Sequence, residues 1–303
     1  MPSERAGGGL NLSANLRGIA LYTTGIFLGS LMDVLIKWLS GDYPILEIVF
    51  FRGLFALIPA VWLIGREGGI AVLRTNRPGR HLARGIIAFA GMALFFHAFS
   101  VMPLADAYAI GFSAPLMMTA LSLPLLGEVV GPRRWAAVLV GFGGVLVVLW
   151  PDLGSGSSPA DAGWVAALAG TACYAVAALM IRDLSRTDGN AAIVFYGTLL
   201  TVAFSAAALP FGFVMPTPTD ALLLLAVGLL GGLTTIVVTM AFRTAEAVTV
   251  APFEYTSMIW AVLFGALIWG DAPSVYVLAG SGIIIVTALY ILRREKLAVA
   301  AET

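Results

Sequence analysis

Apolar runs close to membrane-spanning length recur along the whole chain. A spanning helix needs about 20 mostly apolar residues. Ten such runs can be traced, at 18–39, 45–64, 82–102, 104–126, 134–150, 162–182, 190–213, 220–242, 246–269 and 274–292. Only Met102-Pro103-Leu104 separates the third run from the fourth, and a proline suits the break at a tight hairpin. The pattern predicts an all-α integral membrane protein with ten transmembrane helices.

The basic residues orient these predicted helices. If the chain crosses the membrane ten times, the side that holds the N-terminus carries 15 of the 17 lysines and arginines. Lys37 lies at the opposite edge of the first run, and Arg52 falls inside the second. Cytoplasmic loops are enriched in basic residues, so both termini are expected in the cytoplasm. The first 17 residues lack the pattern of a cleavable signal peptide, and we expect them to form a cytoplasmic tail.

Composition excludes several classes of protein. The chain has 303 residues, of which 60% are hydrophobic and 11% are charged. A typical soluble domain carries about 25% charged residues, so a soluble enzyme is excluded. The 17 basic and 17 acidic residues cancel, which leaves no basic footprint for nucleic acid. The single cysteine, Cys173, and the two histidines cannot build a metal centre alone, and we expect neither a metal nor a cofactor.

The two halves of the chain resemble each other. Segments of the first run recur 145 residues later, and three further matches follow in the same order, the last being Gly127-Glu128 with Gly270-Asp271. Each copy holds five predicted helices, an odd number, so the second copy must be inverted in the membrane. The predicted division is a cytoplasmic tail at 1–17, a first repeat at 18–150, an external linker at 151–161, a second repeat at 162–292 and a cytoplasmic tail at 293–303.

This arrangement resembles the drug/metabolite transporter superfamily of the EamA type. The first copy carries Pro115, Gly127-Glu128, Pro132 and Gly144 in the family's order, whereas Met258 replaces the proline in the second copy. The chain looks most like the YddG-type amino-acid exporters. The resemblance implies a secondary transporter that exports neutral or aromatic amino acids across the bacterial inner membrane, by alternating access at a central cavity. The alternative is a multidrug or lipophilic-cation efflux carrier of the same superfamily.

The sequence also indicates which partners to expect and which other functions it disfavours. Membrane lipids are expected around the spans, and glycine pairs such as Gly25–Gly29 and Gly228–Gly232 fit either close helix contacts within the chain or a homodimer face. No nucleotide-binding loop and no hydrolase or metalloprotease motif is found, so we expect a carrier and not an enzyme. A passive channel would show rings of polar residues along a pore, and the polar residues here are few.

Charged residues inside the predicted spans are candidates for function. Asp33 and Lys37 are four residues apart on one helix face, so they can neutralise each other or grip a zwitterion. Glu47 and Arg52 lie at the same outer level and can join them in one network. Two further carboxylates, Asp106 and Glu246, open the fourth and ninth spans at matching repeat positions, as helix caps or as gates.

Two more ionisable groups lie deeper in the predicted membrane. His97 in the third span is either a satisfied interior histidine or a group that binds substrate or protons. Glu254 follows Pro252 and precedes Tyr255 in the ninth span, where a broken helix beside a carboxylate is typical of a transporter site. Glu254 is the preferred candidate for proton coupling.

Hydroxyl and aromatic side chains complete the predicted binding site. Thr235 and Thr239 follow one face of the eighth span and can line a cavity or bond to their own helix. Tyr174, Tyr196 and Trp260 fall inside spans, where they either pack in the core or form an aromatic wall for an apolar substrate. Together with His97, Glu254 and Tyr255, these residues are the predicted substrate-binding set.

Overall fold

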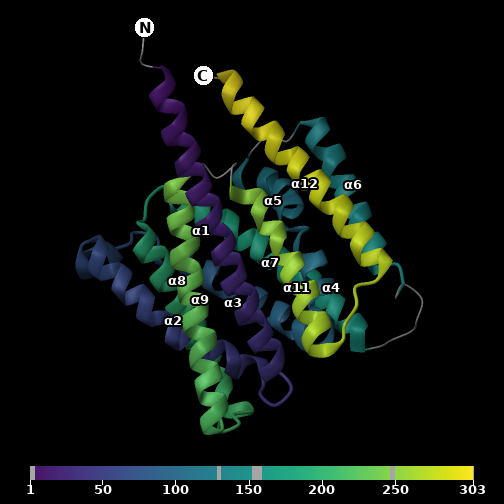
Figure 1. Cartoon of the computed structure of the whole chain (residues 1–303). Coiled ribbons are helices and arrows are strands. Elements are labelled where there is room, and N and C mark those ends of the chain that lie inside the picture. The colour runs from purple at the N-terminus through teal and green to yellow at the C-terminus, as the bar shows by residue number, and fades with distance from the viewer. Residues whose placement is uncertain (1–3, 128–130, 152–158, 246–249, 303) are drawn as a thin grey trace.

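The computed structural model describes residues 4–127, 131–151, 159–245 and 250–302, and this part of the chain is helical with no strand (Figure 1). The α-helices are α1 (Glu4–Leu39), α2 (Ile45–Glu67), α3 (Pro78–Val101), α4 (Leu104–Gly111), α5 (Ala114–Leu126), α6 (Pro132–Leu149), α7 (Pro159–Leu184), α8 (Asn190–Ala208), α9 (Pro218–Thr244), α11 (Thr256–Phe264) and α12 (Val275–Glu302). Short 3₁₀ segments are η1 (Gly69–Leu73), η2 (Leu209–Phe211) and η3 (Ala251–Tyr255), and η4 (Gly265–Trp269) is a π-helical turn. The prediction of an all-α protein is confirmed for these residues.

Seven of the described helical stretches are long and apolar enough to cross a membrane. They cover 16–39, 45–67, 78–101, 104–125, 162–184, 190–211 and 218–241, and three shorter apolar stretches cover 135–149, 253–269 and 275–291. Each of the ten predicted runs overlaps one of these stretches, while the number that cross the membrane stays a prediction. The boundaries differ at both ends of the chain, because α1 begins at Glu4 within the predicted N-terminal tail and α12 continues to Glu302 through the predicted C-terminal tail.

The helices pair in a pattern that is nearly unchanged when the two halves are exchanged. In chain order, α1 packs along α9, and its counterpart α7 packs along α3. The second helices of the halves, α2 and α8, pack on each other, as do the last helices, α6 and α12, which lie side by side in Figure 1. Both chain ends lie on the same side of the bundle, which we call the termini side, and the opposite end is the far side.

Glycines bring the long helices close together. A Cβ atom at Gly25 would lie only 2.6 Å from Val238 Cγ2, so α1 meets α9 at this glycine. A Cβ atom at Gly228 would overlap Phe55 Cβ, so α9 meets α2 there. The contacts of these glycines lie within the chain. The structure thus bears out close helix contacts within the chain at these glycines, and a homodimer stays a prediction.

The fourth helix of each half is interrupted. In the first half, α4 ends at Gly111 and α5 begins at Ala114, and in the second half the 3₁₀ segment η3 passes into α11 at Thr256. Both end at a glycine in the left-handed conformation, Gly127 (φ 70°) and Gly270 (φ 73°), where a Cβ atom would be unfavourable. These glycines, paired by the sequence repeat, therefore occupy equivalent backbone positions 143 residues apart.

Candidate functional site

The two interruptions meet inside the bundle. Pro115 lacks the N–H that would bond to the Gly111 carbonyl, which favours a break at this point of the first half. Near each break a hydroxyl group donates to a backbone carbonyl three residues earlier: Ser113 Oγ to Ile110 and Thr256 Oγ1 to Phe253, both at 2.6 Å. The ring centroids of Phe112 and Tyr255 lie 5.0 Å apart, edge to face. The repeat offset of 143 residues relates each pair, so equivalent residues of the two halves touch.

Glu254 is the carboxylate at this meeting point. It lies in η3, immediately before the break, and is exposed. Tyr22 of α1, Tyr108 of α4 and Tyr174 of α7 all interact with it electrostatically. Its exposed surface is therefore surrounded by helices of both halves. The first half has Gly111 at the corresponding position, so only the second half contributes a carboxylate.

A second polar group lies along α1 and α2. The Tyr108 hydroxyl of α4 donates a hydrogen bond to Asp33 Oδ2 of α1. Arg52 of α2 interacts with Asp33 electrostatically, although no ion-pair contact joins the two side chains. Instead, Arg52 Nε donates to Met32 Sδ at 3.4 Å and Nη1 donates to Met92 Sδ at 3.3 Å. Its guanidinium also lies over Phe96, 5.8 Å from the ring centroid.

Aromatic rings connect these two polar groups. From Phe96, below Arg52, successive ring contacts pass through Phe99, Tyr108 and Phe112 to Tyr255, which adjoins Glu254. The centroid distances along this series are 6.0, 5.9, 6.3 and 5.0 Å. We call these five residues the ring series. Phe96, Phe99 and Phe112 are buried, so the series is packed core that joins the Arg52 group to the break at Glu254. Of the five rings, Tyr108 and Tyr255 are partly accessible.

Lys37 joins elements of both halves at the far side of the bundle. Its Nζ donates to the Met102 carbonyl at 2.9 Å and to Asp271 Oδ2 at 3.3 Å, and it lies 4.9 Å from the centroid of Trp269. The predicted pairing of Lys37 with Asp33 is therefore not formed. Their spacing puts both on one helix face, but their partners come from other segments. Asp33 bonds to Tyr108 of α4, and Lys37 bonds to Asp271, which follows η4.

The predicted outer network is also not continuous. Glu47 Oε2 accepts a hydrogen bond of 2.9 Å from the Val214 backbone N–H, in the connection between η2 and α9. No described contact joins Glu47 to Arg52 or to Lys37, because the three side chains have separate partners. Asp106 lies half-buried in the first turn of α4, where a helix start was predicted. Glu246 lies outside the described residues.

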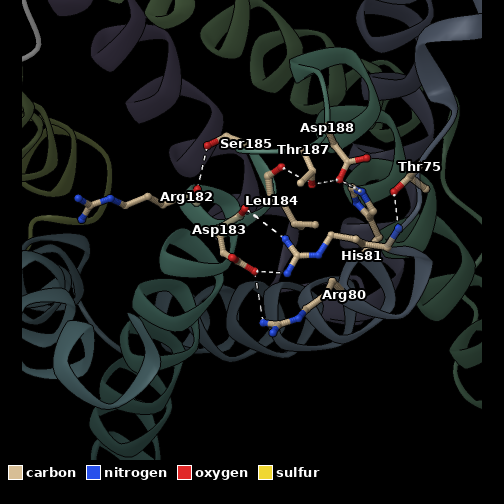
Figure 2. A network of polar contacts seen from close by, with 10 residues as sticks. Thr75, Arg80, His81, Arg182, Asp183, Leu184, Ser185, Thr187 and Asp188 are labelled. Carbon is tan, nitrogen blue, oxygen red and sulfur yellow. Dashed lines mark hydrogen bonds and ion pairs between the residues drawn. The ribbon is translucent and has the colours of Figure 1, made fainter. Parts of the chain in front are cut away.

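A cluster of charged residues joins the halves on the termini side (Figure 2). Arg77 Nη2 and Arg80 Nη1, at the start of α3, lie 3.1 and 3.4 Å from Asp183 Oδ2 near the end of α7. His81 Nε2 lies 3.7 Å from Asp188 Oδ2, and both side chains are buried. We call these five residues the termini-side cluster.

Asp188 is held in its ionised form by this cluster. Burial alone would raise the pKa of Asp188. Hydrogen bonds from Thr75 and Thr187 and the charges of His81 and Arg77 outweigh it, and the pKa lies below its ordinary value. Sequence reasoning missed the cluster because it treated the basic residues only as orientation signals. The available signal was two aspartates, Asp183 and Asp188, on the side of the protein that carries most of the basic residues.

The predicted aromatic wall is only partly assembled. Tyr174 is exposed within electrostatic reach of Glu254. Trp260 packs edge to face on Phe27 of α1, with centroids 4.8 Å apart. Tyr196 lies elsewhere, because its hydroxyl donates to the Leu73 carbonyl at 2.9 Å and its ring packs on His81 of the termini-side cluster. The structure thus separates Tyr196 from the other predicted wall residues.

The remaining predicted residues do not reach Glu254 through any described contact. Thr235 and Thr239 are exposed, and their hydroxyls donate to carbonyls of their own helix, those of Gly231 and Thr235. His97 is exposed and lies eleven residues, or about three helical turns, after the exposed Ile86, so it shares that face of α3. A role for these three residues stays a prediction. Within the described ranges, no group of three or more histidine, cysteine or carboxylate side chains could hold a metal.

Comparison with known proteins shows what the chain is similar to. A riboflavin transporter of Rhizobium johnstonii is 31% identical, over 88% of this chain and 87% of that protein. An S-adenosylmethionine uptake transporter of Rickettsia bellii is 28% identical, over 94% and 96%. The pseudopaline exporter CntI of Pseudomonas aeruginosa is 31% identical, over 92% and 96%.

A solved structure and a family model also match this chain. A solved structure named only "Crystal structure of protein" superposes with a TM-score of 0.63 at 22% identity, over 92% of this chain and 96% of that one. The model of the EamA-like transporter family matches twice, at residues 16–150 and 161–293. The predicted superfamily and the prediction of a transporter that is not an enzyme are both confirmed. Because the two matches cover nearly the whole sequence, the chain belongs to the EamA-like transporter family.

Proposed function

We propose that the chain is a secondary transporter that exports a neutral or aromatic amino acid across the bacterial inner membrane by alternating access. The observation that carries the proposal is the meeting of two interrupted helices, one from each half, beside Glu254. Transporters with inverted repeats place their substrate sites at discontinuous helices between the repeats. Irregular backbone at membrane depth is tolerated where it lines a cavity or is buried in protein.

Contacts at the two ends of the bundle supply candidate gates. On the far side, Lys37 of the first half binds Asp271 of the second. On the termini side, Arg77 and Arg80 of the first half bind Asp183 of the second. A rocking motion between inverted repeats would break one set of contacts while keeping the other. With the termini side in the cytoplasm, as the distribution of basic residues predicts, the lysine contact would close the external mouth.

A second candidate function is efflux of lipophilic cations. The four tyrosines that interact with Glu254 favour this chemistry, because aromatic faces and a carboxylate together attract organic cations. The names of the relatives also widen the set of substrates to test. Riboflavin and S-adenosylmethionine both contain a fused heteroaromatic ring, which would suit the partly accessible rings of Tyr108 and Tyr255.

Counterflow in proteoliposomes tests these proposals. Vesicles containing the purified protein are loaded with one unlabelled compound, and entry of the labelled compound is followed. The panel is tryptophan, phenylalanine, leucine, riboflavin, S-adenosylmethionine and tetraphenylphosphonium. We expect saturable exchange of at least one amino acid. Uptake of tetraphenylphosphonium without any amino-acid exchange would favour the second candidate, and uptake that does not saturate would indicate a channel.

The direction of transport needs its own measurement, because the relatives' names include both an uptake transporter and an exporter. A protease site added after Thr303 identifies the vesicles whose termini face outward. In those vesicles, export carries the substrate from the external medium into the vesicle. Only they should therefore accumulate substrate when an inward gradient drives transport. Equal accumulation in both orientations would contradict a preferred direction.

A further inference from the structure

Arg52 has unusual partners for a charged group inside a membrane span. A guanidinium at this depth is costly and normally pairs with a carboxylate, often through two parallel hydrogen bonds. In the described part of the chain, its hydrogen-bond acceptors are the thioether sulfurs of Met32 and Met92. Thioether sulfur is a weak acceptor, so neither contact replaces a carboxylate. The arginine therefore keeps most of its capacity to bind an anion.

Asp33 is the carboxylate that could have closed this pair. It attracts Arg52 electrostatically, yet it accepts its described hydrogen bond from Tyr108 of α4. Opposite charges attract strongly in a medium of low polarity, so two that are free to approach would be expected to form a direct contact. Met32 precedes Asp33 on α1 and binds Arg52 Nε, while Tyr108 binds the aspartate. Each charge is thus held in place by a neutral neighbour.

The guanidinium adjoins a glycine on one side. Arg52 is half-buried, and its Nη2 donates to no described residue. Gly231 of α9 lies beside this nitrogen: a Cβ atom there would be 3.6 Å from Nη2, and a longer side chain would occupy the adjoining space. The Phe96 ring forms another side of the same surroundings and begins the ring series.

We propose that Arg52 and Asp33 form an open charge pair that receives the α-carboxylate and α-ammonium groups of a zwitterionic substrate. The inference deepens the proposed function and rests on it. The carboxylate of the substrate binds to Arg52, its ammonium group faces Asp33, and its side chain lies against the partly accessible Tyr108, which bonds to Asp33. One positive and one negative group match a zwitterion, whereas a doubly charged phosphate would need more positive charge.

This assignment leaves Glu254 for a separate role. The α-ammonium and α-carboxylate groups share one carbon atom, so they bind to neighbouring side chains. Arg52 interacts with Asp33 electrostatically, whereas no described interaction joins Arg52 to Glu254. Glu254 adjoins the last ring and is available for a proton. Zwitterion recognition and proton coupling are thus assigned to different residues.

Competition with matched indole compounds tests the charge pair. Tryptophan has both groups, tryptamine lacks the carboxylate, and indole-3-propionate lacks the ammonium group. In wild-type vesicles we expect tryptophan to compete for exchange at least about 10-fold better than either analogue, the loss typical of a missing charged hydrogen bond. Equal competition by all three compounds, in vesicles that do exchange tryptophan, would overturn the charge pair and leave the proposed function standing.

Variants assign each group to its residue. Arg52→Lys keeps the charge but loses the planar fork, and Arg52→Met removes both. We expect either variant to weaken competition by tryptophan by about 10- to 100-fold and to leave competition by tryptamine unchanged. Asp33→Asn should weaken competition by tryptophan and leave competition by indole-3-propionate unchanged. Arg66→Lys is the matched control, because this arginine lies on the same helix, over the ring of Trp62 at 4.7 Å.

Binding measured without transport separates recognition from a folding defect. Tryptophan should raise the midpoint of thermal unfolding of the wild type and of Arg66→Lys, and not that of Arg52→Met. If Arg52→Met weakened competition by tryptophan and by tryptamine in equal proportion, the role of Arg52 would be structural and the inference would be wrong. If the wild type exchanged no amino acid at all, the proposed function would fail, and this assignment with it.

Discussion

The contact between α2 and α9 at Gly228 allows a quantitative test of the fold around the proposed site. A Cβ atom at Gly228 would overlap the Cβ atom of Phe55 and would lie 3.3 Å from its Cα and 3.2 Å from the Arg52 carbonyl oxygen. Carbon atoms in ordinary contact are about 3.5–4.0 Å apart. Because the overlapped atom is attached directly to the backbone, no rotation of the phenylalanine side chain can relieve the clash. Gly228→Ala must therefore move the two helices apart.

The expected cost follows from overpacking. An added methyl group in a close-packed contact costs about 1–3 kcal/mol. Replacing glycine by alanine inside a helix otherwise stabilises by up to about 1 kcal/mol. Gly282 of α12 supplies the matched control, because it has nothing within 4 Å of its Cβ position. Both variants share this gain, so Gly228→Ala should be less stable than Gly282→Ala by the overpacking cost of about 1–3 kcal/mol.

Thermal unfolding of the purified variants in detergent measures this difference. We expect the midpoint of Gly228→Ala to fall below that of Gly282→Ala by about 1.5–2 °C for each kcal/mol, because the entropy of unfolding grows with chain length. Phe55→Gly removes the overlapped atom, so in a double-mutant cycle it should cost less in the Gly228→Ala background than alone. Equal midpoints for the two alanine variants, with no coupling to Phe55, would refute the close approach of α2 and α9.

Three further predictions concern charged residues. Glu254→Gln should abolish the pH dependence of substrate exchange, whereas Asp42→Asn, an exposed control on the far side, should retain it; a pH profile of counterflow decides. Lys37→Glu should slow exchange by breaking the far-side contact, and adding Asp271→Lys should restore it; no recovery in the charge-swapped variant would remove the proposed gate. The pKa of Asp188 is lowered in the folded protein, so its stabilisation is present above about pH 4 and is lost as pH falls further. Asp188→Asn should therefore flatten the acid side of a plot of unfolding midpoint against pH, and an unchanged plot would contradict the role of the termini-side cluster.

Features that depend on local sequence were predicted well. The apolar runs located the helices because a spanning segment needs a long, nearly uninterrupted apolar stretch. The match of Gly127 with Gly270 identified two equivalent helix ends, since the left-handed conformation favours glycine at such a position. Glu254 was placed correctly beside a helix interruption because proline near a carboxylate is a local signal.

Features that depend on the approach of distant helices were not predictable. The spacing of Asp33 and Lys37 shows that they share a face, but it carries no information about Tyr108 or Asp271, which lie far away in sequence. Tyr196 has the same apolar surroundings in sequence as Tyr174, and only the packing of α8 against η1 and α3 separates them. The arginines of the termini-side cluster served as orientation signals, and their pairing with Asp183 depends on how α7 ends beside α3.

The difference between Gly111 and Glu254 has a thermodynamic consequence for a carrier of this design. Two identical inverted repeats would make the inward-facing and outward-facing forms mirror each other, with equal free energies. Here the helix break of one repeat carries a carboxyl group and the break of the other carries a hydrogen atom. If the chain alternates access as proposed, protonation of that carboxyl group would contribute to the free-energy difference between the two forms. A pH gradient would thus set the resting orientation of the empty carrier, in addition to any work that it does on the substrate.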